Sequence, residues 1–228
     1  MQKLGIVGGI GPASTLDYYS GVINGAVEKT GEYPPLVIDS IDMNEMCGYF
    51  ERGEYDAVAE MLLDTINNLK NAGATLAVMA SNTPHIVFDK IKASSPLPLI
   101  SIIEATCGFA LEMEYKKVLI LGTAFTMKSG LYTKPLNEKG IEALVPSDED
   151  IKAVHGIIFP NLERGIIVPK DKEKMIAIAE RYISENAVDA VVLGCTEIPL
   201  MIKDGDLSVP AINTTRVHVE AILKQLEK

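Results

Sequence analysis

The sequence predicts an α/β protein made of two similar lobes, each a parallel sheet flanked by helices. Short aliphatic, β-branched runs alternate with longer amphipathic segments, which is the pattern of a parallel sheet wrapped by helices. The chain also matches itself at two pairs of segments with one spacing. Its 228 residues, 47% of them hydrophobic, suffice for one large domain or two small lobes.

Six short runs are expected to form strands because they are apolar and bounded by turn residues. They are residues 4–7, 36–40, 75–80, 99–103, 117–121 and 190–193. Two longer segments, 56–71 and 172–186, carry apolar residues at the period of a helix. A last helix is expected at about 215–227.

The internal repeat is the strongest signal for two lobes. Residues 5–9 resemble 119–123, and residues 75–81 resemble 189–195. From Gly8 to Ser81 the chain advances 73 residues, and from Gly122 to Cys195 it advances 73 residues again. Chance can explain one such pair, but two pairs in register favour lobes related by a pseudo-twofold duplication.

The repeat also predicts where a ligand binds. Ligands of open parallel sheets bind beyond the carboxyl ends of the strands, where the matched segments carry polar residues. If the lobes face each other, Ser81 and Cys195 meet across one cleft. The chain is expected to cross near 96–98 and to return near 209–210. The first lobe would then be 1–97 plus 210–228, and the second 98–209.

Charge and hydropathy exclude several partners. The net charge of −10 argues against nucleic acid, whose affinity comes mostly from lysine and arginine on phosphates, and against an anionic membrane surface. No stretch approaches the roughly 18 apolar residues that span a bilayer. The apolar run at 4–7 is too short for a signal peptide. An acidic substrate would therefore need a local positive pocket.

The cysteines and histidines show no metal-binding pattern. Cys47, Cys107 and Cys195 form no CxxC pair, and no His/Cys/Asp grouping has the spacing of metal ligands. Free thiols point to the reducing cytoplasm. We therefore expect a cytoplasmic protein that holds no metal and no cofactor.

A glycine-rich segment at 8–12 follows the first strand and opens a helix. Such a turn suits an anion, because glycines let the backbone approach a ligand and a proline in the first helical turn sacrifices no N–H bond. The dinucleotide motif fails, because Ser14 stands where its third glycine belongs and Asp39 lies thirty positions beyond Gly9 rather than about twenty. Gly9 and Ile10 remain candidates for substrate binding, and a plain tight turn is the alternative.

Cys195 follows directly on an apolar strand, where helix N-terminal amides can lower the pKa of a thiol. The alternative, a buried cysteine acting as a small hydrophobe, is expected for Cys47 and Cys107, which lie inside helices.

Several polar residues near the strand ends have two possible uses. Asn82 and Thr83 can hold a substrate carboxylate or cap the next helix, and Thr123 and Thr126 present the same choice in the second half. His85 is a possible general base but more readily a structural residue, because it precedes an apolar run. His155 and His218 are expected at the surface or an interface.

Together, four segments resemble the aspartate/glutamate racemase superfamily: Gly-Gly-Ile-Gly-Pro at 8–12, Ser-Asn-Thr-Pro-His at 81–85, Leu-Gly-Thr at 121–123 and Gly-Cys-Thr-Glu at 194–197. The resemblance extends over nearly the whole chain and is closest to the aspartate racemase branch. It implies a homodimeric racemase, independent of pyridoxal phosphate, in which facing cysteines remove and return the α-proton of a small acidic amino acid. Cys195 would be the main acid/base, Thr196 would help to hold carboxylates, and Glu197 would orient its neighbours.

The chain departs from that pattern at Ser81, which stands where the family has its first cysteine. Three explanations remain open: Ser81 acts with help from His85 or water, the enzyme uses one cysteine only, or the serine is an engineered replacement. The alternatives to a racemase are accordingly a one-cysteine lyase, isomerase or decarboxylase acting on a dicarboxylate, and a catalytically impaired ligand-binding protein.

Overall fold

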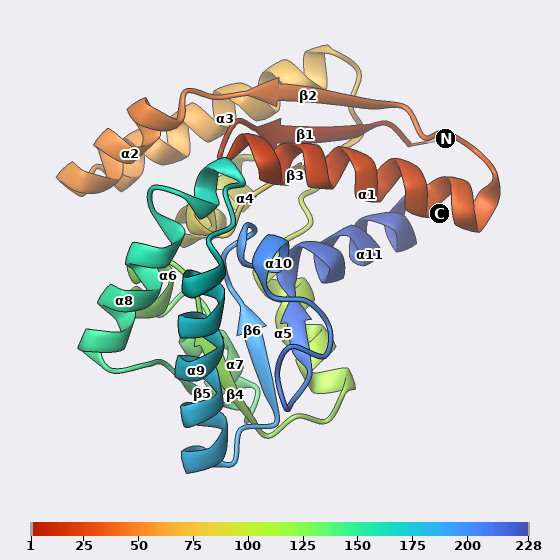
Figure 1. Cartoon of the computed structure of the whole chain (residues 1–228). Helices are drawn as coiled ribbons and strands as arrows, with labels where there is room; N and C mark the ends of the chain where they lie inside the picture. The colour runs from red at the N-terminus through yellow and green to blue at the C-terminus, as the bar shows by residue number, and fades with distance from the viewer. Residues whose placement is uncertain (1, 228) are drawn as a thin grey trace. The chain divides into compact units, whose positions relative to one another are not determined.

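The computed structural model describes residues 2–227 and separates into two compact units. One unit comprises the described residues up to Ile102 together with those from His218 onward, and the other runs from Ile103 to Val217. Each unit contains one parallel sheet with helices beside it (Figure 1). The expected α/β fold with two sheet-bearing lobes is therefore confirmed.

The first unit has a sheet of three parallel strands in the order β2-β1-β3. The strands are β1 (Leu4–Gly8), β2 (Leu36–Ser40) and β3 (Leu76–Met79). The central strand, β1, and its neighbour β3 are buried along their whole length. Continuous burial explains why these strands are apolar runs rather than alternating ones, as is usual for a parallel sheet covered on both faces.

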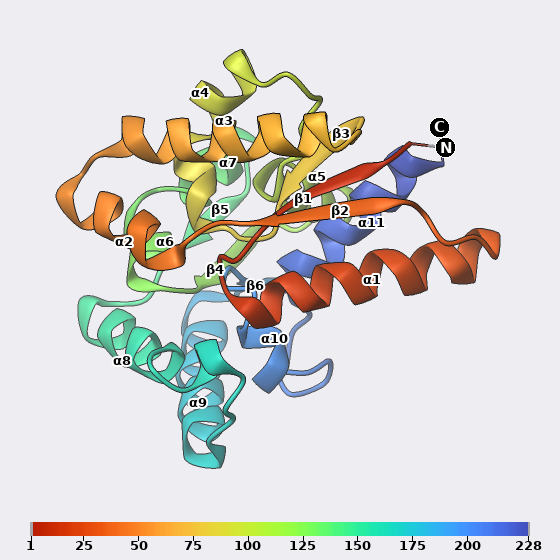
Figure 2. The same ribbon diagram turned by 90° about the horizontal axis from the view of Figure 1, so that it is seen from above.

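Helices cover both faces of the first sheet (Figure 2). On one face, Ile6 and Val78 pack with α1 (Pro12–Thr30) and the last part of α11 (Thr214–Leu226). On the other face, Val7 and Met79 pack with α3 (Tyr55–Asn71) and α4 (Phe88–Ser94). The remaining elements of this unit are α2 (Met43–Arg52) and the short 3-10 helix η1 (Thr83–Val87).

The second unit has four parallel strands in the order β5-β4-β6-β7. They are β4 (Lys117–Leu121), β5 (Glu142–Leu144), β6 (Ala190–Leu193) and β7 (Ala211–Asn213). On one face, Leu119 and Val191 share a core with α8 (Asp148–Ile158), α9 (Pro169–Asn186) and α10 (Ile198–Met201). On the other side lie α5 (Ile102–Glu112) and α7 (Thr133–Glu138), as Figure 1 shows. The short helices α6 (Ala124–Lys128) and η2 (Leu162–Arg164) complete the unit.

The two sheets are wound in the same way. Each places the strand that comes first in the sequence between the second and the third. Leu4 pairs with Leu76, and Val118 pairs with Ala190, so both pairings join residues 72 positions apart. The equal spacing in the two halves of the sequence is thus matched by an equal pairing register in the two sheets.

The prediction of a strand at 99–103 is wrong. Leu99 forms only an isolated parallel bridge with Ala77, and α5 begins at Ile102. Pro96 and Pro98 have no N–H to donate, so pairing cannot extend toward the start of this segment. The segment corresponds to β7 of the second sheet, since the Pro98 carbonyl accepts from Ala77 N–H as the Pro210 carbonyl accepts from Val191 N–H.

The chain passes between the units within the first part of a helix each time. It leaves the first unit at Ile102, where α5 begins, and re-enters it at His218, inside α11. Helices expected at 56–71, 172–186 and about 215–227 are found as α3, α9 and α11. Within residues 2–227, no helix is both long enough and apolar enough to cross a membrane.

His218 was expected at the surface or an interface and is instead fully buried in the first unit. Its Nδ1 lies 2.7 Å from the Tyr18 hydroxyl, and its Nε2 lies 3.0 Å from the Ile100 carbonyl oxygen. The ring meets the His85 ring edge-on at 6.3 Å. Burial lowers the pKa of His218 to about 4, and burial with the nearby His218 lowers that of His85 to about 3.

These buried imidazoles predict acid sensitivity. Because both pKa values lie below the ordinary 6.5, the unfolded chain binds more protons as the pH falls. The contribution of the two histidines to the free energy of unfolding is therefore complete above pH 6.5. It is lost progressively as the pH falls toward the pKa values of the folded state. Each histidine contributes a slope of up to about 1.4 kcal/mol per pH unit.

We expect His218→Gln to be less stable at neutral pH but to lose less further stability between pH 6.5 and 5 than the unchanged protein. Urea unfolding at several pH values measures this slope. An unchanged slope in His218→Gln would contradict the assignment.

Candidate active site

The glycine-rich segment after β1 is a tight turn that uses its own polar groups. Gly9 has φ +81°, and a Cβ there would lie 2.5 Å from the Ile41 carbonyl oxygen, so only glycine fits. The Gly9 N–H donates to Thr15 Oγ1 at 3.0 Å. This amide is therefore already bonded within the turn, and Ile10 beside it is buried.

Ser81 follows β3 and is held through its backbone neighbours. The Ala80 N–H donates to the Val7 carbonyl at 3.0 Å, which extends the pairing of β1 and β3 by one residue. The Ser14 hydroxyl donates to the Ala80 carbonyl at 2.6 Å. Ser81 itself is 8% exposed, so its hydroxyl sits in a largely buried position at the carboxyl end of the first sheet.

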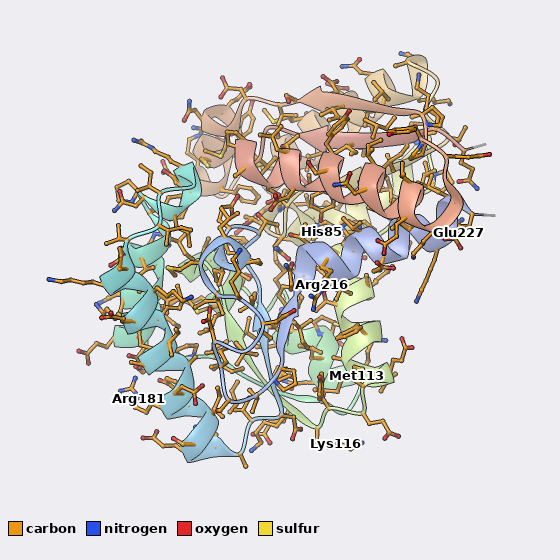
Figure 3. The ribbon with its side chains drawn as sticks, turned by 45° about the vertical axis from the view of Figure 1, so that its right-hand side comes forward. His85, Met113, Lys116, Arg181, Arg216 and Glu227 are labelled. Atoms are coloured by element: carbon orange, nitrogen blue, oxygen red, sulfur yellow. The ribbon has the colours of Figure 1, made fainter. Side chains whose placement is uncertain are left out.

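Asn82 and Thr83 lie next to Ser81, where η1 begins. Asn82 is buried and makes no side-chain capping bond to η1, so the capping alternative is not used there. Thr83 is half-buried. His85 lies one turn further on, beside α11 in Figure 3, stacked on Phe88 with ring centroids 5.2 Å apart.

Cys195 follows β6 in the same way that Ser81 follows β3. The Gly194 N–H donates to the Leu121 carbonyl at 2.6 Å, the counterpart of the bond from Ala80 to Val7. The Thr214 hydroxyl donates to the Leu193 carbonyl at 2.8 Å, so both polar groups of the peptide bond between Leu193 and Gly194 are held. Cys195 and Thr196 are both buried at the carboxyl end of the second sheet.

The Cys195 thiol shares one carboxylate oxygen with Thr196. Its Sγ donates to Glu197 Oε2 at 3.1 Å, and Thr196 Oγ1 donates to the same oxygen at 2.9 Å. Burial, followed by the charge of Glu197, raises the pKa of Cys195 well above its ordinary value. The backbone amides of Glu197 and Ile198 lower this pKa, as expected, but the effects of burial and of the Glu197 charge are larger. The thiol is therefore protonated at neutral pH in this arrangement.

Thr123 and Thr126 form a small hydroxyl pair after β4. Thr123 caps α6 by accepting from the Thr126 N–H at 3.2 Å, and the two hydroxyl oxygens lie 3.0 Å apart. The capping use is thus realised in the second unit. His155 accepts from the Ala124 N–H at 3.4 Å, so this histidine supports the same turn.

The other cysteines and His85 do not offer a reactive group of the same kind. Cys107 is buried as expected, and burial raises its pKa to about 11. Cys47 was expected to be buried and is exposed on α2, so that expectation is wrong. His85 has both ring nitrogens engaged, with the Ser81 carbonyl and the Ile102 N–H. Across residues 2–227, no three His, Cys, Asp or Glu side chains are grouped to hold a metal ion.

Each unit therefore gathers its own candidates at the carboxyl end of its sheet. The first holds Gly9, Ile10, Ser81, Asn82, Thr83 and His85, and the second holds Thr123, Thr126, Cys195, Thr196 and Glu197. The sequence did not reveal the hydroxyls of Ser14, Thr15 and Thr214, which bond backbone groups at these ends. Their only signal is a position within the first turn of a helix that follows a strand.

Two proteins of known structure resemble this chain in sequence and fold over its whole length. An aspartate racemase homologue from Pyrococcus horikoshii is 38% identical with a TM-score of 0.87, and a candidate Asp/Glu racemase from Yersinia pestis is 32% identical with a TM-score of 0.91. In both comparisons all of this chain and all of the other chain are covered. The broad specificity amino-acid racemase RacX of Bacillus subtilis is 25% identical over 93% of this chain and 92% of its own.

The family model described as Asp/Glu/Hydantoin racemase matches residues 7–222, which include both strand-end segments with Ser81 and Cys195. A match of this extent, with the fold shared by the two structures above, settles the family. The chain belongs to the Asp/Glu/hydantoin racemase family.

Proposed function

We propose that this protein is a cofactor-independent racemase of aspartate, glutamate or a similar small acidic amino acid. The observation that carries the proposal is the repeated strand end. The same backbone bond, from Ala80 to Val7 and from Gly194 to Leu121, precedes Ser81 in one unit and Cys195 in the other. A racemase needs an acid/base group on each face of one carbon, and a repeated unit supplies two.

In the proposed reaction, Cys195 acts on one face of the α-carbon. Because its thiol is protonated, it must first give up a proton, and the Glu197 carboxylate at 3.1 Å is placed to accept it. The resulting thiolate removes the α-proton. Ser81 returns a proton on the opposite face, with water rather than His85 as its helper, because both nitrogens of His85 are already bonded.

The charge that grows on the substrate carboxylate must be stabilised by fixed donors. We assign this role to the amide of Asn82, the hydroxyls of Thr83, Thr123, Thr126 and Thr196, and the turn at Gly9 and Ile10. Asn82, Thr126 and Thr196 are buried, so they would hold the ligand away from water, where hydrogen bonds to charge are strongest.

The wider setting is also part of the proposal. None of the three cysteines forms a disulfide, which fits a reducing cytoplasm. The family resemblance implies a homodimer. The Bacillus subtilis relative is named for broad specificity, so other amino acids belong in any substrate test.

A second candidate function follows from Ser81. A hydroxyl is a far weaker acid than a thiol, which would suit an enzyme that needs Cys195 alone, such as a lyase, isomerase or decarboxylase of a dicarboxylate. Release of carbon dioxide or a changed double bond would identify it. Tight binding of an amino acid with no exchange of its α-hydrogen would instead indicate a binding protein.

The first test follows the α-hydrogen of L- and D-aspartate and L- and D-glutamate in deuterated water by NMR. We expect one enantiomer to exchange quickly, through Cys195, and the other slowly, because an alkoxide of Ser81 is costly to form. Ser81→Cys should raise racemisation by about 10²–10⁴-fold, the typical contribution of one acid/base group. Cys195→Ala should abolish exchange of the favoured enantiomer, and Cys47→Ser, at the exposed cysteine, is the control. Exchange that survives Cys195→Ala would refute the mechanism.

The second test concerns Glu197. Its charge and its hydrogen bond both raise the pKa of Cys195, so Glu197→Gln should shift alkylation of this thiol by iodoacetamide to lower pH. Peptide mass spectrometry across a pH series measures the midpoint at Cys195 separately from the other cysteines. Proton exchange should slow at neutral pH, because the acceptor of the thiol proton is gone. A midpoint that stays or rises would contradict this role of Glu197.

A further inference from the structure

We propose that His85 is a positioning residue for Ser81, supplying to the Ser81 carbonyl the hydrogen bond that the backbone of the first unit cannot make. This inference rests on the proposed function of Ser81 and adds a residue that controls one face of the reaction only.

The argument starts from a difference between the two repeated strand ends. In the second unit, the Cys195 carbonyl accepts a hydrogen bond from the Ile198 N–H at 3.1 Å. The same step of three residues from Ser81 leads to Pro84, which has no N–H to donate. The Ser81 carbonyl would thus lack this donor, and a buried carbonyl left without a hydrogen bond is destabilising.

His85 fills that gap. Its Nδ1 lies 3.0 Å from the Ser81 carbonyl oxygen, and because a carbonyl can only accept, the ring proton must be on Nδ1. Its Nε2 then carries the lone pair and accepts the Ile102 N–H at 3.3 Å. A single neutral tautomer thus joins the Ser81 backbone to the first residue of α5.

The surroundings of His85 hold the ring in this state. It is buried, stacked on Phe88, and faces the edge of His218. His218 has the opposite tautomer, with its proton on Nε2 toward the Ile100 carbonyl and its Nδ1 accepting from the Tyr18 hydroxyl. Every ring nitrogen of the pair therefore has a partner, and none remains to exchange protons with a substrate.

The consequence for the reaction is one-sided. His85 contacts the Ser81 backbone within the first unit, whereas Cys195 is held by Leu121 and Thr214 within the second. Loss of the His85 bond should displace the Ser81 hydroxyl and leave the thiol in place. A displacement on the order of 1 Å can slow a reaction by about 10²-fold.

The two nitrogens can be separated by amide substitutions. In His85→Asn, the side-chain amide can reach the Nδ1 position and still donate to Ser81, so the exchange served by Ser81 should fall less than about threefold. In His85→Gln, the amide reaches the Nε2 position instead, and this exchange should fall roughly 10- to 100-fold. Exchange served by Cys195 should change little in either variant.

Restoring a backbone donor gives the sharpest test. Pro84→Ala restores a backbone N–H at the position that corresponds to Ile198. The double variant that combines His85→Gln with Pro84→Ala should therefore recover most of the exchange served by Ser81 that His85→Gln alone loses. Tyr18→Phe is the matched control: it removes a bond from the same buried network without touching Ser81, and it should leave the ratio of the two exchange rates unchanged. Urea unfolding reports separately whether each variant is folded.

An observation independent of activity completes the test. Nitrogen-15 NMR of the histidine rings at neutral pH should show His85 neutral with its proton on Nδ1. A proton on Nε2, equal slowing of both faces in His85→Gln, or no recovery with Pro84→Ala would each overturn the assignment. Absence of any α-hydrogen exchange in the unchanged protein would instead contradict the proposed function, and the NMR result would still report on the bond from His85 to Ser81.

Discussion

The candidate site depends on one backbone hydrogen bond that occurs in both units. The residue that follows β3 donates to a carbonyl of β1, and the residue that follows β6 donates to a carbonyl of β4. These bonds run from Ala80 to Val7 and from Gly194 to Leu121. This bond carries parallel pairing one residue past the strand and so determines where the next side chain emerges. A Cβ at Gly194 would lie 3.2 Å from the Leu121 carbonyl oxygen, which is a tight contact. The polar residues at each sheet end take their places from this register.

The balance at Cys195 shows how burial and local dipoles compete. Helix amides stabilise a thiolate, but they act over one turn, whereas burial removes the whole hydration shell of the charge. Glu197 adds a like charge at hydrogen-bond distance. The thiol at rest is therefore protonated, and it donates a hydrogen bond to Glu197 Oε2. Such a site responds to a ligand that displaces water or neutralises Glu197, because either change alters the cost of the thiolate.

The sequence predicted the sheets well because their strands are buried on both faces and read as apolar runs. The repeat was also informative, because the equal spacing in its two halves is matched by an equal register in the two sheets, Leu4 with Leu76 and Val118 with Ala190. The three-residue strands β5 and β7 were missed because three residues carry no periodicity. The segment after Pro98 misled for the opposite reason: it has the composition of a strand, but it follows a proline directly and α5 already begins at Ile102.

The candidate site was predictable where it follows a strand and not where it depends on tertiary partners. Ser81 and Cys195 could be named from the repeat, whereas burial of His218 could not, because its helix also carries polar residues. The bond from Thr214 to Leu193 joins residues 21 positions apart, and that from Ser14 to Ala80 joins residues 66 apart. Such contacts leave no mark in local sequence, since any hydroxyl at the right place can make them.

The way α11 re-enters the first unit at His218 bears on the order in which the protein is assembled. The second unit is one continuous stretch of chain, from Ile103 to Val217, and has all its residues as soon as that stretch leaves the ribosome. The first unit begins earlier but lacks Val219, Ile222 and Leu223, which complete one of its two core clusters. During synthesis this face of the N-terminal sheet is therefore covered by α1 but not yet by α11, while the unit encoded after it can already fold.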